Sequence, residues 1–332
     1  MVMKNDRVET QLQCVGIDMS METFDVGISV GKKTLVQRFT VRNSGLNQFR
    51  NWLRKNNIHN PHLWIEATGR YWEGLAEWAV KVGFKVTVVN PRCIRHFAIS
   101  KLKLNKTDPL DARTILRFGE CAEDGEFRSW KPKTAALKEL RDLQVEIVGL
   151  NKAIGQERNR LKCGLTSEIV KDSIKQTIAM LTSQKKRLQK ESSRLIKSDA
   201  QLKGTYGVLK TIRGFGDVTI AFLLAKIDFG AFSKGRQLVK FAGLDSIRFE
   251  SGKSVKKKER ISRTGHADLR SALYWPAIVA IRDDEATAAF AQNIVARNCN
   301  MVAICAVMAR LLRIAFARVR DSRKVFAQMP AT

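Results

Sequence analysis

The chain has 332 residues, with 59 lysines and arginines against 32 aspartates and glutamates, a formal net charge of +27 at pH 7. This length suffices for two or three domains with ordinary hydrophobic cores. So large a positive charge is atypical of enzymes of small metabolites and predicts a polyanionic partner, nucleic acid first. The charge is uneven, because residues 1–130 hold 20 basic and 14 acidic residues, whereas residues 131–332 hold 39 and 18.

The six cysteines form no C-x-x-C pair and have no histidine at zinc-ligand spacing, which predicts reduced thiols of an intracellular protein. No N-terminal stretch has the layout of a signal peptide, and no apolar run reaches 18 residues. The most apolar segment, Met301–Ala317, is interrupted by Arg310 and Arg313. We therefore expect a cytoplasmic protein that acts on nucleic acid and has no membrane partner.

The first 130 residues have the pattern of an α/β domain. Apolar and β-branched runs predict strands, and amphipathic runs predict helices between the later strands. The predicted strands are residues 13–18, 24–30, 34–41, 63–65 and 85–89, and the predicted helices are residues 45–55 and 71–82. Gly31-Lys32-Lys33 is a hairpin turn, and Asn90-Pro91 closes the fifth strand. A three-strand meander followed by strand–helix units is the order of the ribonuclease-H-like fold.

Two of these strands end in an acid, Asp18 after the first strand and Glu66 after the fourth. In a ribonuclease-H-like sheet the first and fourth strands are neighbours, so the two carboxylates are expected near each other. Further on, Asp108 and Asp111 stand three residues apart, which on a helix places both on one face. Pro109 sets φ for the start of that helix.

Carboxylates held close together repel unless a cation lies between them, and their hard oxygen atoms favour Mg²⁺ or Mn²⁺. The alternative is that Asp108 caps a helix and Asp111 is its acidic N3 residue, while Asp18 ends a strand and Glu66 is solvated. Four acids at positions that one fold brings together favour the metal site. Two basic residues that flank the helical pair are candidate nucleic-acid contacts, Lys106 and Arg113.

Residues 131–200 predict a coiled-coil helical hairpin. Apolar residues alternate spacings of four and three along residues 136–154. A second such seam runs along residues 174–195, with Lys185 and Ser192 at two of its positions, and Cys163–Ser167 separates the two runs. The helices serve either as an internal antiparallel pair or as a subunit interface. Their basic outer faces either lie along nucleic acid or are solvated.

Residues 201–332 predict a mostly helical domain that contains a helix–hairpin–helix-like turn at Ile212–Gly216. Gly214 and Gly216 would let backbone N–H groups approach a phosphate at the next helix N-terminus, beside Arg213. A purely structural turn between helices is the alternative. From Gly265 to about Arg320 the pattern is helical, with a break at Asp283-Asp284-Glu285.

Ser251 and Gly252 fall in a predicted loop or hairpin before a strongly basic run. A serine hydroxyl is a poor nucleophile unless a base or a metal activates it, so composition alone makes Ser251 a turn residue. The basic residues here are candidate contacts to a nucleic-acid backbone: Lys253, Lys256, Lys257, Lys258, Arg260 and Arg263.

Several motifs occur in a characteristic order along nearly the whole chain. They are G-I-D at Gly16–Asp18, I-E-A-T-G at Ile65–Gly69, N-K-T-D-x-x-D-A-R at Asn105–Arg113, I-R-G-F-G at Ile212–Gly216, F-A-G-L at Phe241–Leu244, E-S-G at Glu250–Gly252 and G-H-x-x-L-R-x-A-L-Y at Gly265–Tyr274. With them, the chain resembles the insertion-sequence transposases of the Asp-Glu-Asp-Asp type, a group that includes a pilin-gene invertase. One departure is Arg213, where the family more often has proline.

The resemblance implies a RuvC-like catalytic domain at 1–130, a coiled-coil hairpin at 131–200 and a transposase domain at 201–332. It implies that Asp18, Glu66, Asp108 and Asp111 hold Mg²⁺, and that Ser251 attacks a DNA phosphate and becomes covalently linked to it. It further implies a non-coding bridge RNA that pairs with donor and target DNA, consistent with the lack of a base-reading motif in the sequence. We also expect a homodimer or tetramer on DNA, because exchange of two duplexes needs several active sites.

Two other functions compete with a transposase. A RuvC-like nuclease or junction resolvase would use metal-activated water and leave Ser251 a structural role. A non-catalytic nucleic-acid-binding protein would use its acids only as helix caps. Covalent trapping on DNA would distinguish the transposase from the nuclease. Mg²⁺-dependent cleavage would distinguish both enzymes from the non-catalytic binding protein.

Overall fold

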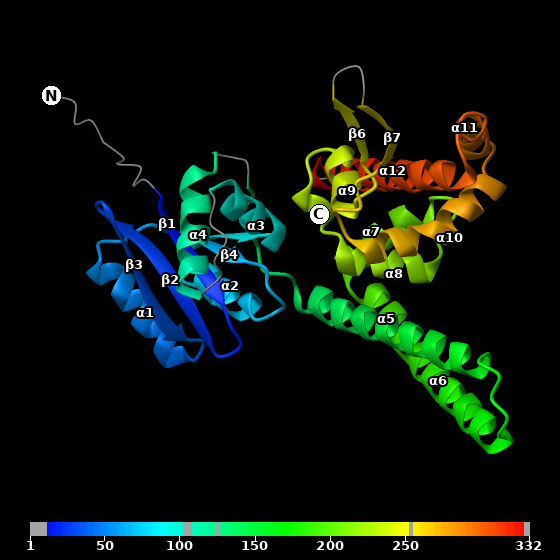
Figure 1. The fold of residues 1–332 in the computed structure, drawn as a ribbon, viewed down its shortest axis with the longest axis horizontal. Helices are drawn as coiled ribbons and strands as arrows, with labels where there is room; N and C mark the ends of the chain where they lie inside the picture. The colour runs from blue at the N-terminus through cyan, green and yellow to red at the C-terminus, as the bar shows by residue number, and fades with distance from the viewer. Residues whose placement is uncertain (1–11, 102–107, 124–126, 252–254, 329–332) are drawn as a thin grey trace. The chain divides into compact units, whose positions relative to one another are not determined.

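The computed structural model describes residues 12–101, 108–123, 127–251 and 255–328, and the side chains of residues 108–110, 248–258 and 324–328 are outside that description. The chain divides into two compact units, Met1–Pro132 and Lys133–Thr332 (Figure 1). The first unit is built on a five-stranded mixed sheet, and the second is mainly helical.

The sheet of the first unit has the strand order β3-β2-β1-β4-β5. Its strands are β1 (Gln13–Met19), β2 (Thr23–Val30), β3 (Lys33–Thr40), β4 (Pro61–Glu66) and β5 (Lys85–Val89). The first three strands form the antiparallel meander, while β4 runs parallel to both β1 and β5. The prediction that the first and fourth strands are neighbours is therefore confirmed, and the sheet is consistent with a ribonuclease-H-like unit.

The two faces of the sheet differ in character because side chains alternate along each strand. Val15 and Ile17 of β1 point into a fully buried core with α1 (Asn43–Lys55) and α2 (Trp72–Lys81). The opposite face of β1 carries Gly16 and Asp18, and α4 (Asp108–Cys121) packs on that face. One face thus carries the larger hydrophobic core, and the other carries a smaller core around Trp64 and Ile115 together with the candidate chemistry.

The segment between β5 and α4 contains a helix that the sequence pattern did not predict. Asn90-Pro91 was predicted only to close the fifth strand, but it starts α3 (Pro91–Ser100). The Asn90 side chain accepts a hydrogen bond of 2.9 Å from the backbone N–H of Arg92, and Pro91 occupies the first helical turn. Proline needs no N–H partner there, so the dipeptide begins a helix as readily as it ends a strand.

In the second unit, α5 (Ala135–Leu161) and α6 (Glu168–Ser198) form a long hairpin (Figure 1). Gln144 hydrogen bonds to Ser192 at 3.0 Å, and Asn151 hydrogen bonds to Lys185 at 3.2 Å. Because the partner numbers run in opposite directions, the helices are antiparallel. The internal pairing proposed from the sequence is what the chain forms, while knobs-into-holes packing stays a prediction.

The hydrophobic core of the second unit includes α8 (Asp217–Lys226), whose residues 220–225 are all buried. The break predicted at Asp283–Glu285 is confirmed, because Asp284 caps α11 (Glu285–Val295) through a 2.9 Å hydrogen bond from the Thr287 N–H. The other elements are α7 (Ala200–Lys210), η1 (Phe229–Ala231), α9 (Gly235–Ala242), β6 (Ser246–Ser251), β7 (Val255–Ile261), α10 (Ala267–Asp283), α11 (Glu285–Val295) and α12 (Asn300–Gln328). In the described part of the chain, no helix is long and apolar enough to cross a membrane.

Candidate active site

Two of the predicted catalytic acids lie at the same end of adjacent strands. Ile17 of β1 is the register partner of Ile65 of β4, and Asp18 and Glu66 are the next residues of these parallel strands. Neighbouring strands are separated by about 4.8 Å, so the two acids begin from adjacent backbone positions. Both are partly buried, and Glu66 accepts a 3.2 Å hydrogen bond from the Thr68 hydroxyl.

The helix that carries the third predicted acid, Asp111, lies directly on two glycines of this face of the sheet. Gly16 of β1 and Gly27 of β2 are register partners. A Cβ atom on Gly16 would lie only 2.4 Å from the Ala112 carbonyl oxygen, and one on Gly27 would lie 3.0 Å from the same atom. Any side chain at Gly16 would therefore push α4, and with it Asp111, away from the face that carries Asp18.

The remaining predicted residues of this site are only partly described. Asp108 begins α4, as the proline in the first turn predicted, but its side chain lies outside the described residues, as does all of Lys106. Arg113 is exposed. Within the described residues, no three acidic, histidine or cysteine side chains lie close enough together to hold a metal ion. The four-acid site, which includes Asp108, stays a prediction whose carboxylate oxygens suit Mg²⁺ or Mn²⁺.

The same face carries a further acid, Asp25, that is not among the predicted site residues. Asp25 of β2 is the register partner of Asp18, yet it is only 5% exposed. Its carboxylate receives hydrogen bonds of 2.8–3.2 Å from Nε and Nη2 of Arg38 on β3. The predicted turn of three residues, 31–33, would pair residue 25 with residue 39. The turn that forms has two residues, 31–32, and pairs Asp25 with Arg38 instead.

The predicted helix–hairpin–helix-like turn joins α7 to α8. Gly214 has a φ of +91°, and a Cβ atom there would lie 2.3 Å from the Pro276 carbonyl oxygen of α10. Packing inside the unit therefore already requires this glycine. Gly216 is the N-cap of α8 and faces open space among the described residues, and Arg213 is exposed.

The first turn of α8 already carries a negative charge. Asp217 accepts a 2.8 Å hydrogen bond from the Tyr206 hydroxyl and another from Lys210. These two donors, Lys210 first, lower the pKa of Asp217. A phosphate at this helix N-terminus would compete with Asp217 for the favourable end of the dipole. Phosphate binding by Gly214 and Gly216 stays a prediction.

The predicted hairpin around Ser251 is present. Ser251 is the last residue of β6, and its register partner is Val255 at the start of β7. The basic run continues along β7, where Arg260 is exposed, and Arg263 follows with a φ of +51°. The side chains of Ser251, Lys256, Lys257 and Lys258, and the whole of Lys253, lie outside the described residues.

The base of this hairpin is closed by two glycines from different motifs. Gly243 ends α9 with a φ of +69°, and Gly265 precedes α10. A Cβ atom on Gly265 would lie 2.1 Å from the Phe241 carbonyl oxygen and 2.3 Å from the Gly243 nitrogen. The F-A-G-L and G-H-x-x-L-R motifs therefore meet by backbone contact.

Arg270 reinforces this closure from α10. Its Nη1 atom donates hydrogen bonds to the backbone carbonyls of Ala242 at 2.9 Å and Gly265 at 3.1 Å. The Arg263 N–H also donates to the Gly243 carbonyl at 3.1 Å. The motifs on either side of Ser251 thus hold both ends of the hairpin that carries it.

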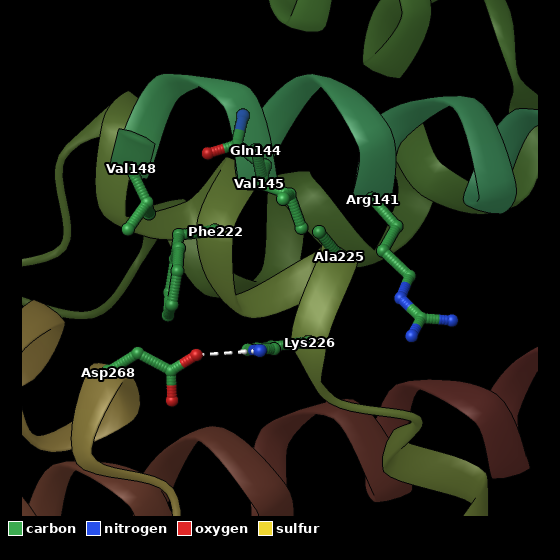
Figure 2. A pocket seen from close by; sticks show the side chains of 8 residues that line it. All are labelled: Arg141, Gln144, Val145, Val148, Phe222, Ala225, Lys226 and Asp268. Atoms are coloured by element: carbon green, nitrogen blue, oxygen red, sulfur yellow. Dashed lines mark ion pairs between the residues drawn. The ribbon is translucent and has the colours of Figure 1, made fainter. Parts of the chain in front are cut away.

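A pocket of about 200 Å³ lies in the second unit where α5 faces α8 and the start of α10 (Figure 2). Lys226 and Asp268 form an ion pair of 2.6 Å at its edge, which joins α8 to α10. Its lining consists of Arg141, Gln144, Val145, Val148, Phe222, Ala225, Lys226 and Asp268. None of the predicted site residues is among the residues given for this lining.

Comparison with known proteins agrees with this arrangement. A family model described as a transposase matches residues 15–170, which include all four predicted acids. A second, described as the transposase IS116/IS110/IS902 family, matches residues 206–292, which include the glycine turn and Ser251. The pilin gene-inverting proteins of Moraxella bovis and Moraxella lacunata are each 31% identical to the chain over 314 residues, or 93% of this chain and 96% of theirs. The chain therefore belongs to the IS110 family of transposases.

Proposed function

We propose that this transposase-family protein is a DNA recombinase that moves an insertion sequence, with its chemistry divided between its two units. The first unit supplies the carboxylates, and the second supplies Ser251 on the hairpin. The observation that carries the proposal is the register of β1 with β4, which places Asp18 and Glu66 side by side on the face covered by α4.

In this proposal Asp18, Glu66, Asp108 and Asp111 hold Mg²⁺, with Mn²⁺ as a substitute. When bound, the metal would polarise the scissile phosphate and lower the pKa of an attacking hydroxyl. The close contact of Gly16 with α4 supports this role, because it brings the helix that carries Asp111 close to the strand that carries Asp18.

Ser251 is the proposed nucleophile. Its oxygen forms a bond to the DNA phosphorus while the bond from phosphorus to one sugar oxygen breaks, and that oxygen leaves as a hydroxyl with the proton from serine. The protein–DNA ester conserves the phosphodiester bond energy, so a second sugar hydroxyl can reverse the step and rejoin the strand. The closed base of the β6–β7 hairpin supports this role, since a nucleophile must be held in position.

A non-coding bridge RNA and a homodimer or tetramer complete the proposal. Base pairing to the RNA would choose the donor and target DNA, and the protein would hold both nucleic acids by their backbones. The excess of basic over acidic residues in residues 131–332 supports such binding to nucleic-acid backbones. The exposed Arg213 and Arg260 and the adjacent lysines of β7 are the proposed backbone contacts.

The test is to incubate the protein with the DNA that flanks the element and with the neighbouring transcript, in Mg²⁺, and to run a denaturing gel. Wild-type protein is expected to give a protein–DNA adduct, and Ser251→Ala is expected to give neither adduct nor nick while binding both nucleic acids normally. Ser254→Ala is the matched control, three residues away. Nicking by Ser251→Ala in Mg²⁺ would make water the nucleophile and the protein a RuvC-like nuclease or resolvase.

A further inference from the structure

We infer that Arg38 binds a nucleic-acid phosphate at the edge of the candidate active site, and that Asp25 is the positioning residue that holds its guanidinium there. The inference rests on the proposed function, because it assigns a contact beside the proposed metal-binding acids. Neither residue belongs to a motif by which the sequence resembles the family.

A row of charged residues crosses four adjacent strands at one end of the sheet. Glu66 on β4 and Asp18 on β1 follow the paired residues Ile17 and Ile65. Asp18 is the register partner of Asp25 on β2, and Asp25 is the register partner of Arg38 on β3. The row therefore reads acid, acid, acid, arginine from β4 to the edge strand β3.

All four residues belong to one face of the sheet. Gly16 and Gly27 both contact α4, and Asp18 and Asp25 each lie two residues from one of them, so they share that face. Arg38 bonds to Asp25 and so lies there as well. The adjacent Phe39 points the other way into the core, where its ring packs 5.5 Å from that of Phe49.

The guanidinium of Arg38 is fixed by two of its nitrogens. Nη2 lies 2.8 Å from Asp25 Oδ2, and Nε lies 3.0 Å from Oδ1 and 3.2 Å from Oδ2. The Asp25 side chain is 7% exposed, whereas that of Arg38 is 53% exposed. A nearly buried carboxylate thus orients an arginine whose side chain is half exposed, and this preorganises the guanidinium at the solvent-facing end of the row.

A phosphate is the anion that this position fits. Two strand spacings separate the Asp18 and Arg38 backbones, about 10 Å in all, within reach of a phosphate close to the one being cut. A cluster of carboxylates repels the DNA backbone, so a fixed cation beside it offsets that repulsion. The planar fork of arginine matches phosphate oxygens better than lysine does. Because β3 is the edge strand, nucleic acid can approach Arg38 from the side of the sheet.

The test measures binding of a fluorescein-labelled duplex that contains the element end, by anisotropy over a range of KCl concentrations. Arg38→Met is expected to weaken binding about tenfold and to reduce the slope of log K against log salt by about 1. Arg54→Met is the matched control, because Arg54 is an exposed arginine on α1, which packs on the opposite face. It should leave the slope unchanged.

Loss of Arg38 alone leaves Asp25 buried without this partner, so a second variant separates folding from binding. The double variant Asp25→Asn/Arg38→Met removes both charges and is expected to keep the wild-type Tm while binding as weakly as Arg38→Met. Asp25→Asn alone keeps the arginine but loosens it. It is expected to bind DNA within about twofold of wild type and to exchange strands at least tenfold more slowly.

A wild-type salt slope and affinity in the double variant would overturn the inference and leave the pair a purely structural ion pair. The proposed function fails separately. If Asp18→Ala exchanged strands as well as wild type, the acids would not be catalytic, whatever the salt slope of Arg38→Met.

Discussion

Gly16 of β1 lies against the backbone of Ala112 of α4 so closely that a Cβ atom on the glycine would be 2.4 Å from the Ala112 carbonyl oxygen. The contact joins two motifs that are almost a hundred residues apart in the sequence. It also explains why the G-I-D motif begins with glycine: a larger residue would separate the strand that carries Asp18 from the helix that carries Asp111.

We expect Gly16→Ala to lower the free energy of unfolding of the first unit by about 1–3 kcal/mol, because the backbone of α4 has to move. Strand exchange should fall further than stability does, since Asp111 moves with the helix. Denaturant unfolding and the adduct assay at matched folded fractions would measure both effects. Gly74→Ala is the control, because a Cβ atom there meets no described atom within 4 Å and alanine favours the α2 helix. Equal stability in the two variants would contradict the contact.

Replacing any of Asp18, Glu66, Asp108 or Asp111 by alanine should abolish recombination and leave the fold intact or slightly stabilised, because repulsion among the acids is relieved. Metal binding should disappear as well. Mg²⁺ or Mn²⁺ is expected to raise the Tm of the wild type but not that of the variants. Glu77→Ala on α2 serves as the control. Full strand transfer by Asp111→Ala would rule out the four-acid site.

Gly265→Ala should loosen the base of the Ser251 hairpin. The new methyl group would overlap the Phe241 carbonyl and the Gly243 nitrogen. These are backbone atoms, so they cannot make room by a change of side-chain rotamer. We expect a loss of about 1–3 kcal/mol in the second unit and a drop in adduct formation, with RNA binding retained. Hydrogen exchange of the β6 and β7 amides would report the loosening. Unchanged protection in the variant would show that the glycine contact does not hold the hairpin.

Protonation of His266 should destabilise the second unit at acid pH. Burial lowers the pKa of this histidine, and Asp268, 3.9 Å away, opposes that shift only partly. Since the folded pKa lies below the unfolded value of about 6.5, the unfolded chain binds the proton more readily and stability falls as the pH drops through this range. Comparing the Tm of wild type and His266→Asn between pH 7.5 and 5 would measure the effect. A parallel decline in both proteins would assign it to other groups.

Much of the arrangement follows from local sequence patterns. The alternation of apolar residues and the turn at Gly31 predicted the meander, and its order along the chain predicted that β1 and β4 are neighbours. Asp18 and Glu66 could be assigned to adjacent positions for that reason alone. The helical start at Asp108 followed from Pro109, whose ring restricts the backbone locally.

The tertiary structure decided what depends on contacts between distant segments. Asp25 looks like an isolated acid in a buried strand until β3 brings Arg38 to its carboxylate. Gly16, Gly243 and Gly265 look like ordinary loop or strand glycines until a second backbone lies where a side chain would be. Asn90-Pro91 begins a helix or ends a strand equally well by local preference, and the chain after it forms α3. Such outcomes depend on packing between elements, a free energy that no stretch of sequence carries by itself.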